Sequence, residues 1–121
     1  MIRGVHAMFY SSAPDELRAF FRDKLGLRAN DIGGGWLIFD VPEADVGCHP
    51  ARRASHAISF YCDDIHGTVA ALKKKGVRFT SKIEDQGWGI ATTFRLPGAG
   101  EVTLYEPRYE KKKKRAPRRR R

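Results

Sequence analysis

The chain has 121 residues, of which 41% are hydrophobic, and its formal net charge of +9 comes from 23 basic and 14 acidic residues. A chain of this length has room for one domain with one core, and no segment approaches the ~20 apolar residues of a membrane span. Nine of the basic residues lie in residues 111–121, which leaves the rest of the chain with 14 basic and 14 acidic residues. This balance excludes a strongly basic surface on the folded body.

The first half of the chain predicts a strand, a helix and three shorter strands. Residues 5–11 alternate and include aromatics, which is typical of a strand with His6, Met8 and Tyr10 on one face. A helix with an apolar stripe follows and ends at Gly26. Turn residues then separate three predicted strands, over 27–30, 36–40 and 45–49.

The second half predicts the same order of elements after a linker at 50–53. Residues 54–62 form its opening strand, and Asp63 or Asp64 caps a helix that ends at Gly76. Strands follow over 77–80, 88–96 and 101–106, and the turn 97–100 joins the last two.

The two halves are related by a spacing of 50 positions. His6 and His56 share this offset, and so do Gly26 and Gly76. A fixed period means that one supersecondary unit is used twice. We therefore predict two copies, over about 2–52 and 54–108, that share one core.

Several stretches carry a resemblance to a known family. They are GVHAMFY in the first strand, FFRDKLGL at the end of the first helix, HAISFYCDDI, LKKKGVRF and the closing LPGAGEVTLYEPR. With the repeat, they make the chain similar to the vicinal oxygen chelate superfamily of glyoxalases, bleomycin-resistance proteins and extradiol dioxygenases. The resemblance implies an α+β fold in which two βαβββ modules, within a single domain over 1–109, form a curved mixed sheet around a cavity.

The resemblance also implies a possible metal site. Family members that bind a divalent metal (Fe, Zn, Ni, Mn or Mg) use inward-facing residues on the first and fourth strands of each module, and His6 and His56 match two of these positions. Thr103 stands at the usual final carboxylate position, and Gly47 at or near the fourth-strand position, with His49 of like parity beside it. Glu101 could supply an anionic ligand, or a bulge could bring in Glu106.

The same resemblance implies a substrate pocket. Its predicted lining combines apolar, aromatic and hydroxyl side chains: Met8, Tyr10, Ile58, Phe60, Trp88, Thr103 and Tyr105. Three functions follow as alternatives. The first is a metal-dependent lyase, isomerase, dioxygenase or transferase that acts on a small oxygen-bearing molecule. The second is a metal-free binding protein of the bleomycin-resistance type, and the third is nucleic-acid association through the tail.

The sequence also carries expectations about the location and the partners of the protein. The start of the chain lacks the apolar run of a secretory signal, and Cys48 and Cys62 lack metal-type spacing. We therefore expect a cytoplasmic protein without a disulfide. The resemblance implies a homodimer. Residues 110–121 are too charged to fold alone and are expected to be a disordered tail that contacts nucleic acid without sequence preference.

Overall fold

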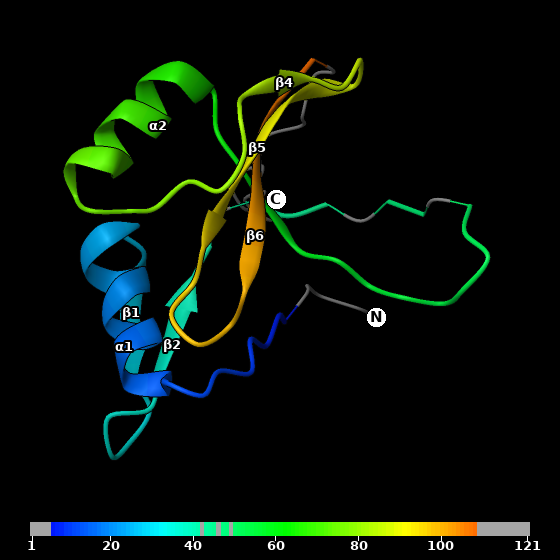
Figure 1. Cartoon of the computed structure of the whole chain (residues 1–121). Coiled ribbons are helices and arrows are strands. Elements are labelled where there is room, and N and C mark those ends of the chain that lie inside the picture. Colours follow the sequence, from blue (N-terminus) through cyan, green and yellow to red (C-terminus); the bar gives the residue numbers. More distant parts are fainter. Residues whose placement is uncertain (1–5, 42, 46, 49, 109–121) are drawn as a thin grey trace, which may run out of the picture.

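The computed structural model describes residues 6–41, 43–45, 47–48 and 50–108. The fold is a mixed α+β arrangement with two sheets and two helices, as predicted (Figure 1). Its elements are α1 (Pro14–Ala19), the π-helical turn η1 (Phe20–Lys24), β1 (Arg28–Asp31), β2 (Leu37–Asp40), β3 (Ser59–Tyr61), α2 (Ile65–Lys74), β4 (Glu84–Asp85), β5 (Gly89–Arg95) and β6 (Glu101–Pro107). No helix in this described part of the chain is long and apolar enough to cross a membrane.

The larger sheet has the strand order β3-β6-β5-β4, while β1 and β2 form a separate antiparallel pair. Strand β3 is parallel to β6, and the other pairings are antiparallel. The β5–β6 register runs without interruption from Gly89 opposite Pro107 to Arg95 opposite Glu101. The bulge that could have turned Glu106 to the other face is therefore not formed.

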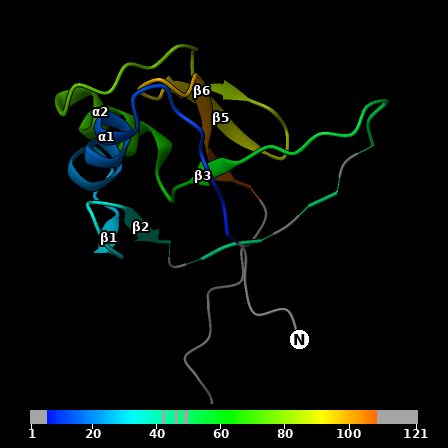
Figure 2. The same ribbon diagram turned by 90° about the horizontal axis from the view of Figure 1, so that it is seen from below.

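The core lies between the helices and one face of the larger sheet. Phe94, Ile65 and Leu96 are its largest fully buried side chains. The ring of Phe94 lies 6.2 Å from Phe20 and 6.4 Å from Phe60, measured between centroids. Both helices lie on the same side of this sheet, which leaves its opposite face free of helices (Figure 2).

The predicted helix ends are confirmed where local chemistry decides them. Gly26 and Gly76 follow the two helices with φ of 71° and 85°, a region that L side chains rarely adopt. The Asp64 carboxylate caps α2 by accepting a hydrogen bond from the Gly67 amide at 3.2 Å. The N-cap of α1 is Ala13, which has no side-chain hydrogen bond to the helix.

Two predicted strands are not formed in the described residues. Residues 6–11 are irregular. In the region of the strand predicted over 45–49, the described residues 43–45 and 47–48 are irregular as well. The strand predicted over 54–62 shortens to β3, and that over 77–80 to one bridge between Phe79 and Phe94. The physical reason is that alternation indicates which side chains are apolar, whereas a strand also needs a neighbour that accepts its hydrogen bonds.

The chain that leads to α1 is anchored on the turn between β5 and β6. The Ser12 amide donates to the Gly98 carbonyl at 3.1 Å, and the Ser11 hydroxyl donates to the Pro97 carbonyl at 2.7 Å. Further back, the Phe9 ring packs against the ring of Phe21 at 5.3 Å. These contacts hold the segment that carries His6 beside the core.

Candidate functional site

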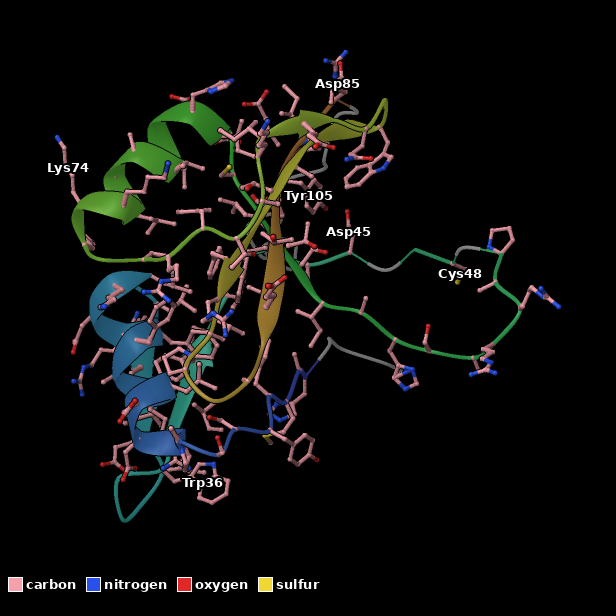
Figure 3. The ribbon with its side chains drawn as sticks, in the orientation of Figure 1. Trp36, Asp45, Cys48, Lys74, Asp85 and Tyr105 are labelled. Atoms are coloured by element: carbon pink, nitrogen blue, oxygen red, sulfur yellow. The ribbon has the colours of Figure 1, made fainter. Side chains whose placement is uncertain are left out.

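The face of the larger sheet that is turned away from α2 is the candidate site, and we call it the open face. Alternation along β6 places Val102, Leu104 and Glu106 on the helix side. It places Thr103 and Tyr105 on the open face. The register adds further members of the open face on β3 and β5: Ser59, Tyr61, Ala91 and Thr93. Figure 3 shows Tyr105 on the side of the sheet away from α2.

Three aromatic side chains meet at one end of the open face. The rings of Trp88 and Tyr105 lie 5.1 Å apart at 69°, and those of Tyr61 and Tyr105 lie 6.0 Å apart at 43°. Tyr105 is buried, whereas half of Trp88 is exposed. The cluster therefore presents an aromatic surface to solvent on a rigid base, and such surfaces bind flat or apolar ligands.

Trp88 is held in place by the end of β6. Its carbonyl accepts a hydrogen bond from the Arg108 amide at 3.0 Å, and the Arg108 guanidinium pairs with the Asp85 carboxylate. These contacts tie the β4–β5 connection to the strand that carries Tyr105. The ring of Trp88 is thus positioned by the fold even though its side chain is exposed.

Hydroxyl groups lie at the other edge of the open face. The Thr93 hydroxyl lies 2.6 Å from that of Thr80 and donates to the Ser81 hydroxyl at 2.9 Å. Thr103 is half-buried and stands opposite Thr93 in the register. The open face therefore combines an aromatic end with a polar edge, which can orient a ligand that carries oxygen atoms.

Glu106 is already engaged on the helix side of the sheet. One of its carboxylate oxygens accepts a hydrogen bond from the Ile65 amide at 3.0 Å, at the N-terminus of α2. A carboxylate is favourable at this end of a helix because the first amides lack intrahelical partners. Glu106 therefore lies on the opposite face of the sheet from Thr103, and Glu101 is exposed opposite Arg95.

The structure describes two of the three predicted histidine ligands. His6 and His56 are both exposed in irregular segments, and His49 lies outside the described residues. Within the described ranges, no group of three or more His, Cys, Asp or Glu residues could hold a metal ion. A facial site needs two imidazoles and a carboxylate together, and the donor set placed here does not fit one.

The other predicted pocket residues divide between the surface and the core. Met8, Tyr10 and Ile58 are 44%, 87% and 39% exposed. Phe60 packs with the core, where its ring stacks on that of Phe9 at 6.2 Å. Its neighbour Tyr61 reaches the open face instead, and strand alternation was the signal that could have indicated it.

The two cysteines do not add a nucleophile to the open face. Burial raises the pKa of the Cys62 thiol, because a thiolate is poorly solvated there. Its sulfur lies 3.7 Å from the Tyr105 carbonyl. Cys48 is exposed on the stretch between β2 and β3, away from the sheet (Figure 3).

Comparison with known proteins agrees with the fold. A family model described as the Glyoxalase/Bleomycin resistance protein/Dioxygenase superfamily matches residues 3–107. An antibiotic-binding protein from Streptomyces sp. CB03234 is 19% identical with a TM-score of 0.60, over 88% of this chain and 99% of that one. A superfamily member from Sphaerobacter thermophilus is 24% identical with a TM-score of 0.59, over 86% and 97%. A lactoylglutathione lyase from Agrobacterium tumefaciens is 18% identical with a TM-score of 0.57, over 83% and 89%. Comparison with curated proteins gave no match.

Proposed function

Because the chain belongs to the glyoxalase/bleomycin resistance protein/dioxygenase superfamily, we propose that it binds a small organic molecule on the open face. The binding is noncovalent and needs no metal. One observation carries this proposal: β6 turns Thr103 toward the open face and Glu106 toward the helices. The resemblance places Thr103 at the position of the usual carboxylate, and Glu106 lies on the other side of the sheet, hydrogen-bonded to the N-terminus of α2.

The aromatic cluster indicates the kind of ligand. Trp88, which packs on the buried Tyr105, supplies flat apolar surface, and Thr93 and Thr103 supply hydroxyl groups on the same face of the sheet. A partly planar molecule that carries oxygen atoms suits this combination. One structural neighbour is described as an antibiotic-binding protein, and this description supports a role in sequestering a small molecule.

Replacing Trp88 with alanine is expected to weaken ligand binding about tenfold, because one exposed aromatic contact contributes on the order of 1.4 kcal/mol. Bleomycin and S-lactoylglutathione are suitable probes, measured by calorimetric titration on protein treated with a chelator. Trp36→Ala is the matched control, because Trp36 is also 50% exposed but lies beside the separate β1–β2 pair. Equal losses from both variants, or binding that disappears with chelation, would contradict the proposal.

A metal-dependent lyase, isomerase, dioxygenase or transferase is the second candidate. His6 and His56 occupy matching positions of the repeat, and a lactoylglutathione lyase is among the structural neighbours. Elemental analysis of the purified protein separates the two functions. A stoichiometric divalent metal that is lost on His56→Ala would favour the enzyme over the binding protein.

We further propose a homodimer. Strand β3 is an edge strand of the larger sheet, and Met8, Tyr10 and Ile58 expose apolar surface. A second copy would cover this surface and remove the open edge. Sedimentation equilibrium is expected to give twice the mass of the chain, and Met8→Lys combined with Tyr10→Lys is expected to give the monomer. A wild-type protein that stays monomeric at micromolar concentrations would rule this out.

Residues 111–121 lie outside the described residues, and we propose that they contact nucleic acid without sequence preference. Their nine cations would release counterions from DNA. Truncation after Glu110 is expected to abolish retention on DNA at low salt and to change the melting temperature by less than ~5 °C. Unchanged retention would place DNA binding on the folded body.

Both cysteines are free, and we propose a cytoplasmic location on this ground.

A further inference from the structure

A groove lies on the helix side of the fold and borders the polar edge of the open face. It runs between α2 and the segment that follows Phe79, and it has a volume of about 530 Å³. We call it the α2 groove and define it by six of its lining residues: Val69, Lys73, Phe79, Ser81, Lys82 and Ile83. Its volume is within the range of about 300–1,000 Å³ that small-molecule pockets occupy.

The apolar part of the α2 groove is held rigidly. Val69 is buried in the core, and Phe79 packs edge-on against Phe94 with ring centroids 5.5 Å apart. The Thr80 amide donates to the Thr93 carbonyl at 2.9 Å, which fixes the wall of the groove to β5. A ligand would therefore meet preformed apolar surface, and little ordering cost would accompany binding.

The rim of the α2 groove is cationic. Lys73 and Lys82 are both exposed, no Asp or Glu lines the groove, and neither ammonium group pairs with a carboxylate of the described residues. A lysine in the last turn of a helix has an ordinary explanation, since it interacts favourably with the helix dipole. That explanation covers Lys73 but not Lys82, which lies after the helix and on the opposite wall.

We propose that the α2 groove binds a small organic anion. Its apolar body, of about one or two rings, would lie on Val69, Phe79 and Ile83, and its carboxylate, sulfonate or phosphate would reach Lys73 and Lys82. The Ser81 hydroxyl offers a further donor at the rim. The groove borders the open face at Thr80 and Ser81, whose hydroxyls contact that of Thr93, but the buried Thr92 that lines the groove points to the opposite side of β5 from Thr93.

The experiment uses 2-naphthoate as the probe and its neutral amide, 2-naphthamide, as the comparison. Amide chemical shifts of the full-length protein are followed by NMR during titration. Naphthoate is expected to move the amide signals of Val69, Thr92 and Ile83 and to leave that of Tyr105 in place. Lys73→Gln combined with Lys82→Gln is expected to weaken naphthoate binding about tenfold, since two ammonium groups are lost.

The matched control is Lys74→Gln combined with Lys75→Gln. It removes the same charge from adjacent residues outside the groove lining, and Lys74 points away from the sheet (Figure 3). This control is expected to change the affinity by less than about twofold. The proposal is overturned if both double variants weaken binding equally, if naphthamide binds as tightly as naphthoate, or if the shifts fall on the open face. The Trp88→Ala variant tests ligand binding on the open face, whereas the naphthoate titration tests the α2 groove. Either proposal can therefore fail while the other holds.

Discussion

Replacing Phe94 with alanine is expected to lower the free energy of unfolding by about 3–5 kcal/mol. Phe94 is 1% exposed, and its ring contacts the rings of Phe20, Phe60 and Phe79. These neighbours come from η1, from β3 and from the segment before β4. The truncation would therefore leave a cavity where three parts of the chain meet, and no single element can move to fill it.

Urea denaturation of the variant and the wild type gives this difference by linear extrapolation. Ile32→Ala is the control, because Ile32 is 67% exposed in the turn between β1 and β2 and its truncation is expected to change stability by less than about 0.5 kcal/mol. If Phe94→Ala does not fold, Phe94→Leu keeps most of the volume and is expected to cost less than about 1.5 kcal/mol. A Phe94→Ala variant as stable as the control would contradict the described core.

Replacing Gly98 with alanine is expected to destabilise the fold by about 2–5 kcal/mol. Two costs add here. The φ of 62° is unfavourable for an L side chain by roughly 1–2 kcal/mol. The new Cβ would also lie 2.7 Å from the Ala13 amide nitrogen and 2.6 Å from the Ser11 hydroxyl oxygen, and such overpacking costs about 1–3 kcal/mol.

Gly100→Ala separates these two costs. Gly100 has a φ of 71° in the same turn, but a Cβ there would meet nothing within 4 Å. Its replacement is expected to cost only the backbone strain, roughly 1–2 kcal/mol. Thermal unfolding of the two variants side by side provides the measurement. Equal losses of stability in the two variants would mean that the segment before α1 does not pack against the turn between β5 and β6.

Much of the fold could be predicted because it depends on local chemistry. The α+β class and the superfamily were predicted and are confirmed. The helix ends at Gly26 and Gly76 follow from backbone conformations that favour glycine, and Asp64 is a favoured cap. Alternation along a regular last strand also puts Glu101 and Thr103 on one face and Glu106 on the other, and the β5–β6 register agrees.

The candidate site could be predicted only in part. Trp88, Thr103 and Tyr105 were expected in a pocket, and the structure brings them to one face of the sheet or its end. Tyr61 was missed because the spacing of 50 positions aligned Phe60 with Tyr10. The metal ligands stay a prediction for His6 and His56, whose segments lack strand pairing in the described residues.

The sequence by itself determined the helices, their C-terminal ends, the turns and the alternation within the strands that form, because each depends on neighbours a few residues away. Only the tertiary structure decided which strands pair and which face meets the helices. Phe60 illustrates the difference. The spacing of 50 positions aligns Phe60 with Tyr10. The ring of Phe60 stacks on that of Phe9 instead, because β3 pairs with β6 and turns Phe60 toward the helices. Glu106 is the second case, since its bond to the Ile65 amide joins residues 41 positions apart. Such contacts depend on the register between distant segments, which local patterns do not encode.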